Sequence, residues 1–142
     1  MPNVLLTGAA RGIGRATVAR LTKAGWDVYA GVRSQADGAS LVEEFGDRVH
    51  PVQLDITSSK DVAALDGLLP EDLAAVVNNA GVVQGGPVEA VRIDDLRQQL
   101  EINVVGQVAV TQAVLPRLRK SHGRVVFVSS VSGRITTPLT GA

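Results

Sequence analysis

The sequence lacks cysteine altogether and is poor in histidine. Without cysteine, these 142 residues can form no disulfide framework, no thiol nucleophile and no cysteine-ligated metal site. The two histidines, His50 and His122, lie far apart in the chain, so a histidine zinc site is not expected and no metal is predicted.

A charge surplus and a long hydrophobic run are also missing. Fourteen Lys and Arg residues balance fourteen Asp and Glu, which argues against a nucleic-acid binder, because such proteins carry a basic surplus. No apolar run approaches the roughly 20 residues that span a bilayer. The N-terminus, MPNVLLTGAARG, lacks the basic start and cleavage site of a signal peptide. We therefore expect a cytoplasmic protein that does not insert into a membrane.

Short apolar runs alternate with longer helical patterns along the chain. With 45% hydrophobic and 20% charged residues the chain can bury a core, and its length suits one domain over residues 1–142. The expected strands are residues 3–7, 27–32, 49–55, 74–78 and 124–129. The expected helices are residues 12–24, 36–45, 58–68 and a long helix from 94 to about 120.

This alternation predicts an α/β fold, a doubly wound parallel sheet with helices on both faces. We expect a Rossmann-like strand order of 3-2-1-4-5. The sequence ends 13 residues after position 129, where a further strand and helix would follow in such a fold. The sheet is therefore predicted to be truncated after its fifth strand, and the domain to be incomplete at its C-terminal end. The fifth strand would then be an exposed edge.

A glycine-rich loop, TGAARGIG at residues 7–14, lies between the first expected strand and the first expected helix. A nucleotide pyrophosphate meets a helix N-terminus at this place in such folds. Gly8 would permit the tight turn, Gly12 the approach of phosphates, and Gly14 close packing of the helix. A glycine-rich turn without a ligand is the alternative. The candidate cofactor-binding residues of the loop are Gly8, Arg11, Gly12, Ile13 and Gly14.

The end of the second expected strand, GVRS at residues 31–34, indicates which nucleotide is bound. An acid at this place holds the ribose hydroxyls of NAD, whereas an arginine accommodates the 2′-phosphate of NADP. No carboxylate occupies this strand end, and Arg33 is placed to meet a phosphate, with Arg11 as a second candidate. Each could be an ordinary surface arginine, but together they favour NADP(H).

Further motifs follow in order along the chain, and together with the glycine loop they resemble the short-chain dehydrogenase/reductase family over all 142 residues. The motifs are TGAARGIG, Asp55-Ile56, NNAG at residues 78–81, Asn103 within EINVVG and Ser130 within VVFVSSVSG. The resemblance implies an NADP(H)-dependent enzyme that transfers a hydride between the nicotinamide and an alcohol or ketone. The segments GVRS and VSSVSGRITTP look most like members that act on lipophilic substrates.

The resemblance also implies roles for single residues. Asp55 would accept a hydrogen bond from the adenine amino group, and Ile56 would pack on the adenine ring. Asn103 would hold a water in a proton relay, and Ser130 would bond the substrate oxygen, so these two are the candidate catalytic residues. The residues expected to line the adenosine ribose are Asn79, Ala80 and Gly81.

One family motif, Tyr-x-x-x-Lys, is not present in the sequence. The usual spacing from Ser130 would place its tyrosine about one residue past Ala142. The sequence's one tyrosine, Tyr29, is followed four residues later by Arg33, but in a strand these positions lie about 13 Å apart. We therefore expect Tyr29 to be part of the core.

Two alternatives to an enzyme stay open. One is a nucleotide-binding sensor without catalysis, and the other is a truncated, inactive member of the family. For the intact enzyme, the resemblance implies a small-molecule substrate and a homo-oligomer, a dimer or a tetramer. No nucleic-acid partner is expected.

Overall fold

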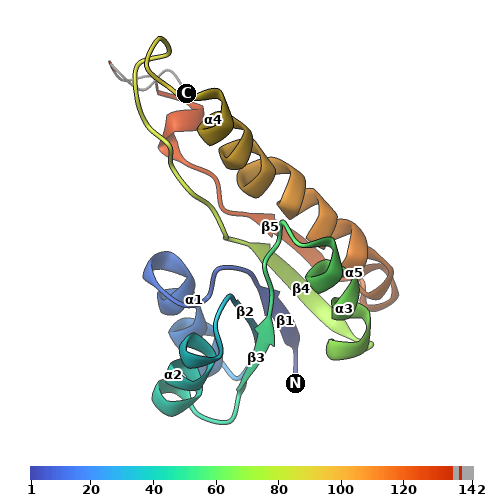
Figure 1. Cartoon of the computed structure of the whole chain (residues 1–142). Helices are drawn as coiled ribbons and strands as arrows, with labels where there is room; N and C mark the ends of the chain where they lie inside the picture. Colours follow the sequence, from blue (N-terminus) through green and yellow to red (C-terminus); the bar gives the residue numbers. More distant parts are fainter. Residues whose placement is uncertain (136–137, 139–142) are drawn as a thin grey trace.

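The computed structural model describes residues 1–135 and residue 138, and it contains one five-stranded parallel sheet (Figure 1). The strand order is β3-β2-β1-β4-β5, which confirms the predicted fold class and topology. The strands are β1 (Asn3–Leu6), β2 (Asp27–Val32), β3 (Val49–Gln53), β4 (Leu73–Asn78) and β5 (Arg124–Phe127). Several strands are one or two residues shorter than predicted, within the usual uncertainty of element ends.

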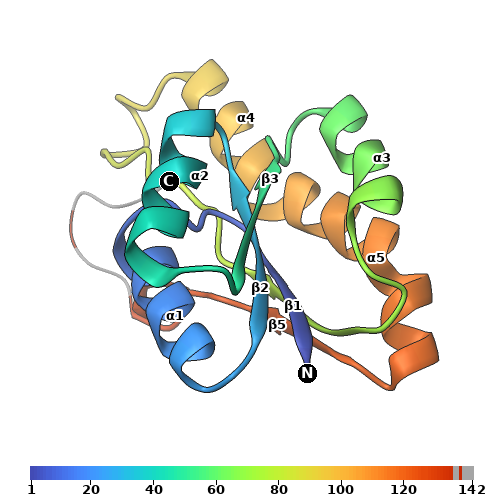
Figure 2. The ribbon, with the colours of Figure 1, turned by 90° about the horizontal axis from the view of Figure 1, so that it is seen from below.

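Helices cover both faces of the sheet (Figure 2). On one face α1 (Gly12–Lys23) and α2 (Gln35–Phe45) pack on β1, β2 and β3, and on the other α3 (Ser59–Leu68) and α5 (Gln107–Ser121) pack on β4 and β1. Each face has its own apolar cluster, because side chains of a strand alternate between the two faces. Representative members are Leu6, Val18 and Leu41 on the α1 face and Leu5, Leu65 and Val110 on the α5 face.

Serine caps set the start of two helices that border the predicted site. The Ser34 hydroxyl accepts from the Asp37 amide at 3.1 Å, and the Ser58 hydroxyl accepts from the Asp61 amide at 3.2 Å. Each serine satisfies a backbone N–H that the first turn of a helix leaves without a partner. The loops after β2 and β3 are thereby fixed in direction.

The long helix predicted at residues 94–120 is not continuous. It consists of α4 (Ile93–Leu100), a π-helical turn η1 (Glu101–Gly106) and α5, which ends at Ser121. The turn brings Gly106 against the chain after β3, where an added Cβ would lie 2.8 Å from the Ile56 carbonyl oxygen. The apolar periodicity of the sequence predicted one regular helix and did not reveal this widened turn, which inserts one extra residue.

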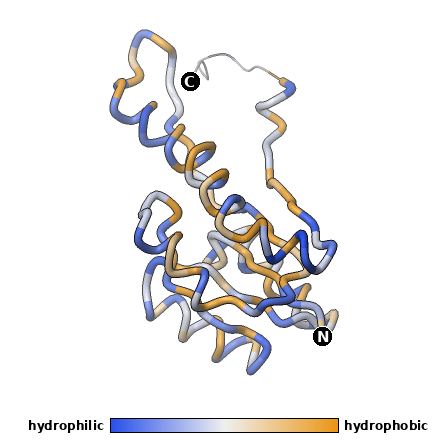
Figure 3. The backbone as a smooth tube through the Cα atoms, turned by 90° about the vertical axis from the view of Figure 1, so that its right-hand side faces the viewer, coloured by the Kyte–Doolittle hydropathy of each residue, from blue (hydrophilic) through white to orange (hydrophobic). Residues whose placement is uncertain are grey.

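Strand β5 forms one edge of the sheet and carries exposed apolar side chains, including Val126 at 44% and Phe127 at 50% exposure. In Figure 3 apolar stretches, in orange, run through the centre of the molecule and along the segment that carries β5. The short helical turn η2 (Val131–Gly133) follows. Residues 136–137 of the VSSVSGRITTP segment, and the expected continuation past Ala142, lie outside the described residues. No helix in the described part of the chain has the length and apolar character needed to cross a bilayer.

Candidate functional site

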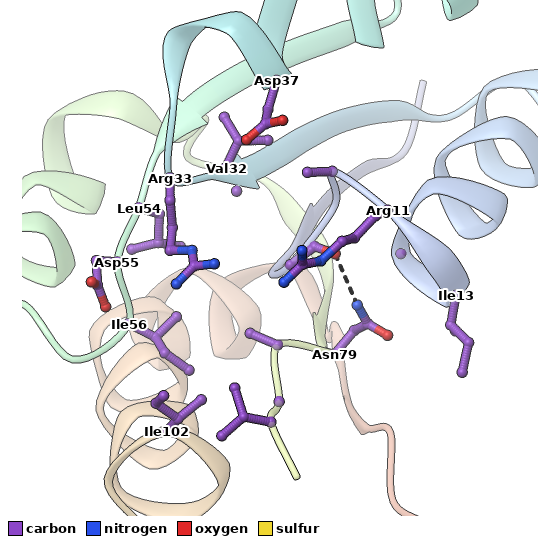
Figure 4. Close-up of a pocket in the computed structure, with 17 residues that line it drawn as sticks. Arg11, Ile13, Val32, Arg33, Asp37, Leu54, Asp55, Ile56, Asn79 and Ile102 are labelled. Carbon is purple, nitrogen blue, oxygen red and sulfur yellow. Dashed lines mark hydrogen bonds between the residues drawn. The ribbon is translucent and has the colours of Figure 1, made fainter. Parts of the chain in front are cut away.

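A pocket of about 380 Å³ is formed by residues that directly follow β1, β2, β3 and β4 (Figure 4). This volume is within the usual range for small-molecule and cofactor sites. Of the eleven cofactor-binding residues predicted from the sequence, only Gly12 does not line it. The ten that do are Gly8, Arg11, Ile13, Gly14, Arg33, Asp55, Ile56, Asn79, Ala80 and Gly81. The structure therefore brings the predicted residues together, and their contacts with a nucleotide stay a prediction.

In the glycine loop, Gly8 and Gly14 lie so close to neighbouring backbone atoms that a side chain would not fit at either position. Gly8 has a φ of +65°, and a Cβ there would lie 2.9 Å from the Ala80 Cα. A Cβ on Gly14 would lie 2.0 Å from the Gly8 carbonyl oxygen and 2.8 Å from Nδ2 of the Asn79 side chain. Gly14 thus permits close packing against the loop itself. Gly12, at a φ of +54°, has no atom within 4 Å of where its Cβ would be, so this side of the loop is open.

Thr7, to which the sequence analysis gave no role, joins the glycine loop to the segment after β4. Its buried hydroxyl accepts from the backbone N–H groups of Asn79 and Ala80, both at 3.0 Å. The Asn79 side chain in turn donates to the carbonyls of Thr7 and Gly8, both at 3.1 Å. The signal for Thr7 in the sequence is a hydroxyl residue that ends an apolar strand just before the glycine loop.

Arg15 is a second residue without a predicted role, and it links the loop to α2. Its guanidinium donates to the Ala10 carbonyl at 3.2 Å and to the Ser40 hydroxyl at 3.0 Å, and it pairs with Glu44. The loop is therefore held from the α2 side as well as from β4. The partners on α2 are 25 and 29 residues away in sequence, so no local pattern could predict this contact.

Arg11 and Arg33 bring two positive charges to the pocket, which Asp37 and Asp55 also line. Both guanidinium groups reach into the pocket from different elements, Arg11 from the glycine loop and Arg33 from the end of β2 (Figure 4). Arg11 is also the N-cap residue of α1, and no side chain of the described residues caps this helix. The positive end of the α1 dipole thus faces the same pocket as the two arginines.

A carboxylate borders the pocket near Arg33, although none occupies the strand end itself. Asp37 lines the pocket from the first turn of α2, and its carboxylate accepts from the Ser34 hydroxyl at 2.7 Å. The pattern at the end of β2 does not predict this acid, because Asp37 lies four residues beyond Arg33 on a helix. No group of three or more His, Asp or Glu side chains that could hold a metal ion occurs in the described residues.

Asp55 follows β3 and lies on the Arg33 side of the pocket, away from Ile13 of α1 (Figure 4). One of its carboxylate oxygens, Oδ1, accepts from the Thr57 backbone N–H at 2.9 Å and from the Thr57 hydroxyl at 2.7 Å. These two donors, with a smaller contribution from the charge of Arg33, hold the pKa of Asp55 below its ordinary value. The backbone N–H of Asp55 donates to Asp61 on α3, so the whole residue is fixed.

Replacing Thr57 with valine is expected to raise the pKa of Asp55. The Thr57→Val variant loses the hydroxyl donor and keeps the backbone donor, so the pKa should move part of the way back to its ordinary value. A carbon-detected NMR titration of the Asp55 carboxyl measures the shift. Because the pKa is lowered in the folded chain, the carboxylate of the wild type stays ionised to lower pH than that of the variant. An unchanged titration would show that the hydroxyl does not act on Asp55.

The two candidate catalytic residues do not line the pocket. Asn103 lies in the π-helical turn, and its side-chain amide accepts from the Val82 N–H at 2.9 Å and donates to the Val82 carbonyl at 2.8 Å. Ser130 is the exposed N-cap of η2, and its hydroxyl accepts from the Ser132 amide at 3.1 Å. The roles of both in catalysis stay predictions.

The comparisons with known proteins agree on one family. Residues 2–142 match the family described as "short chain dehydrogenase". The chain is 37% identical to a 3-amino-tetrahydro-pyrrolizinone reductase of Xenorhabdus hominickii, over 99% of this chain and 49% of that protein. It is 34% identical to an NADPH-dependent 3-dehydrocapnine reductase of Ornithobacterium rhinotracheale, over 99% of this chain and 53% of that protein.

Among solved structures, the closed form of a serine dehydrogenase complexed with NADP+ is similar to this chain with a TM-score of 0.89 and 30% identity. The similarity covers 98% of this chain and 57% of that structure. The chain therefore spans about half the length of the curated relatives described above.

Proposed function

The chain belongs to the short-chain dehydrogenase family, and we propose that it binds NADP(H) for hydride transfer between the nicotinamide and an alcohol or ketone. The observation that carries this proposal is that Arg11 and Arg33 reach into one pocket together with the glycine loop. The bound cofactor would supply or accept the hydride, and the residues of the protein would bind and orient it.

The start of α1 fits a pyrophosphate. No side chain caps the helix, so its first backbone N–H groups can donate to an anion. The space beside Gly12 is open, and Arg11 adds a positive charge at the same place. An anionic group bound here would gain from the helix dipole and from a charge-assisted hydrogen bond.

The far end of the pocket fits an adenine ring. Thr57 occupies Oδ1 of Asp55, and among the described residues Oδ2 has no hydrogen-bond partner, so it can accept from an exocyclic amino group. Ile56, next in the chain, presents an apolar side chain to the pocket and can pack on the ring. Thr57 therefore orients Asp55 so that one oxygen is left for the base.

The choice of NADP(H) over NAD(H) depends on the balance between Arg33 and Asp37. Arg33 can pair with a 2′-phosphate, whereas Asp37 would repel it or hold a free ribose hydroxyl. Asp37 is engaged by the Ser34 hydroxyl, and Arg11 adds a second positive charge to the pocket. The lining also holds Asp55, so the preference for the phosphorylated cofactor depends on direct contacts of the two guanidinium groups with the phosphate. The NADPH-dependent relative and the NADP+-bound neighbour support this preference.

The chain is expected to bind NADPH at least about tenfold more tightly than NADH, because charge-assisted contacts to a phosphate contribute about 1.5–3 kcal/mol each. The variant Arg33→Asp should lose or reverse this preference, since it replaces an attraction with a repulsion. Titration calorimetry with both cofactors gives the ratio directly.

Arg119→Asp is the matched control, because it makes the same charge change on the exposed end of α5. It should lower stability slightly and leave the cofactor ratio unchanged. Equal affinity of the unmutated chain for NADPH and NADH would contradict the proposed cofactor.

The remaining assignments follow from the family. We propose that Ser130 bonds the substrate oxygen. We also propose that Asn103 holds a water of the proton relay. Both atoms of its side-chain amide bond Val82, so other polar groups of the residue would hold this water. The proposed substrate is a small lipophilic alcohol or ketone, and the proposed assembly is a homo-oligomer. A cytoplasmic location stays a prediction from the sequence.

A further inference from the structure

Four side chains on the long helical segment bond four alternate residues, the last residue of β4 and three of the extended segment that follows it. The pairs are Thr111 with Asn78, Gln107 with Ala80, Asn103 with Val82 and Gln99 with Gln84. One set is spaced by four residues and the other by two, and they run in opposite directions. We refer to these four pairs as the side-chain ladder. In Figure 1 the extended segment, in yellow-green, runs from the end of β4 up to the start of α4.

The two pairs nearest the sheet are the more deeply buried. The Asn78 side chain, fully buried, donates to the Thr111 hydroxyl at 2.9 Å, and that hydroxyl donates to the Gln107 carbonyl at 2.8 Å. The Gln107 side chain, 7% exposed, donates to the Ala80 carbonyl at 2.8 Å. Thr111 is thus both acceptor and donor, and it connects the first pair to the second.

In the two outer pairs, helix side chains bond backbone groups that have no hydrogen-bond partner in the sheet. Asn103 bonds both the N–H and the carbonyl of Val82, and the Gln84 N–H donates to the Gln99 side chain at 2.6 Å. Strand β4 ends at Asn78, so these groups lie beyond the last paired residue of the sheet. The helix side chains replace the missing neighbouring strand, which satisfies the backbone there.

The spacing of the ladder has a simple geometric basis. Residues two apart in an extended chain are separated by about 6.6 Å, and residues four apart in an α-helix rise by about 6 Å. The two repeats therefore nearly match in length. They do not match in direction, because four helical residues turn about 400°, which is about 40° more than one full turn.

The π-helical turn compensates for this rotation. Over the three steps from Gln99 to Thr111 a regular α-helix would drift by about 120°, and the outer residue would face away from the segment. A π-helical turn accommodates one extra residue, which takes back about 100°. The turn η1 (Glu101–Gly106) lies between these two positions and contains Asn103. It therefore keeps the four side chains on one line.

The segment held by the ladder is also a wall of the candidate nucleotide site. Residues 80–82 line the pocket, and so does Ile102 from the helix side. Resting on the proposed function, we infer that the side-chain ladder positions residues 80–82 for nucleotide binding, with Gln107 as the most buried of its four helix residues. Gln107 is in this sense a positioning residue, since it acts on the ligand through the Ala80 backbone.

The variant Gln107→Met tests this inference, because methionine keeps the length of the side chain and removes its donor. The affinity for NADPH should fall about tenfold, the effect of losing one buried hydrogen bond. In the absence of nucleotide, the Val82 amide hydrogen should exchange faster by NMR, since loss of the neighbouring pair loosens the segment. A residue that only packed in the core would leave the Val82 exchange unchanged.

Gln112→Met is the matched control, with the same substitution on the same helix at an exposed position. It should change neither measurement. Gln99→Met, at the outer end of the ladder, provides a second variant should Gln107→Met not fold, and it should speed the exchange of the Gln84 amide alone.

The outcomes separate this inference from the proposed function. Unchanged exchange at Val82 and Gln84 in the two variants would overturn the ladder, and faster exchange with unaltered NADPH affinity would overturn its role in positioning. If the unmutated chain does not bind NADPH, the proposed function fails, and the exchange measurements alone decide whether the ladder holds the segment.

Discussion

Replacing Gly14 with alanine is expected to abolish nucleotide binding, with a loss of affinity of about 100-fold or more. The added Cβ would lie 2.0 Å from the Gly8 carbonyl oxygen and 2.9 Å from the Gly8 carbonyl carbon. Both are backbone atoms, so no side-chain rotation can relieve the overlap, and the loop has to open. An open loop moves Arg11 and the α1 N-terminus away from the phosphates, which removes at least two charge-assisted contacts of about 1.5–3 kcal/mol each.

The same substitution should lower stability, although alanine is the better helix former. In a helix without steric conflict, glycine to alanine gains up to about 1 kcal/mol. At Gly14 the overlap should exceed this gain, so the free energy of unfolding should fall by about 1–3 kcal/mol. A fall in the free energy of unfolding, instead of a rise, would therefore indicate the overlap between the added Cβ and the Gly8 carbonyl.

Gly67→Ala is the matched control for this prediction. Gly67 lies in α3, and no atom is within 4 Å of where its Cβ would be. Its replacement should raise the free energy of unfolding by about 0.5–1 kcal/mol and leave NADPH binding unchanged. Urea unfolding and calorimetric titration measure both quantities. A Gly14→Ala chain that binds NADPH as tightly as the unmutated chain would show that the loop tolerates the added methyl group.

The glycine loop illustrates which parts of the site could be predicted from the sequence. Gly8 at the start of the loop, Arg33 and Asp55 each come just after a strand, and the carboxyl ends of neighbouring parallel strands meet at one edge of the sheet. Once the strand order was predicted, these residues had to lie together. Local pattern and topology were sufficient because each residue is positioned by the backbone of its own strand end.

Contacts made across the fold could not be predicted in the same way. Arg15 reaches α2, and the Asn103 side chain bonds the Val82 backbone, because their partners come close only after the helices pack. The π-helical turn was missed for a related reason. It is stabilised by side-chain bonds to a distant segment, whereas the sequence reports only the local apolar periodicity. Asp37 was missed because a helix brings it back to the pocket.

The 142-residue chain by itself is expected to bind NADPH without measurable reduction of a ketone or aldehyde. Reduction of a carbonyl needs a proton donor beside the substrate oxygen, and loss of such catalysis costs about 10²–10⁴-fold in rate. The titratable side chains that line the pocket are those of Arg11, Arg33, Asp37 and Asp55. Arginine does not release its proton in proteins, and the lowered pKa of Asp55 leaves it without a proton near neutral pH. Asp37 already accepts the hydrogen of Ser34.

Tyr29 does not supply the missing donor. It lies in β2 with its ring 4.9 Å from that of His50, and it does not line the pocket. Burial, with the negative charges of Asp27 and Asp72, raises the pKa of Tyr29, which makes its hydroxyl a weaker proton donor. The Ser130 hydroxyl can bond a substrate oxygen, but a serine hydroxyl is not a proton source of the required acidity.

Extending the chain through a Tyr-x-x-x-Lys helix and the strand after it, as the family resemblance implies, should therefore raise the rate by about 10²–10⁴-fold. The measurement is NADPH oxidation with a panel of ketones and aldehydes, made with both lengths at equal cofactor saturation. The matched control is the extended chain with phenylalanine in place of the new tyrosine, which should bind NADPH normally and remain inactive. Reduction by the 142-residue chain at the rate of the extended chain would show that a group within these residues transfers the proton, and Ser130→Ala and Asp37→Asn would then be the variants that identify it.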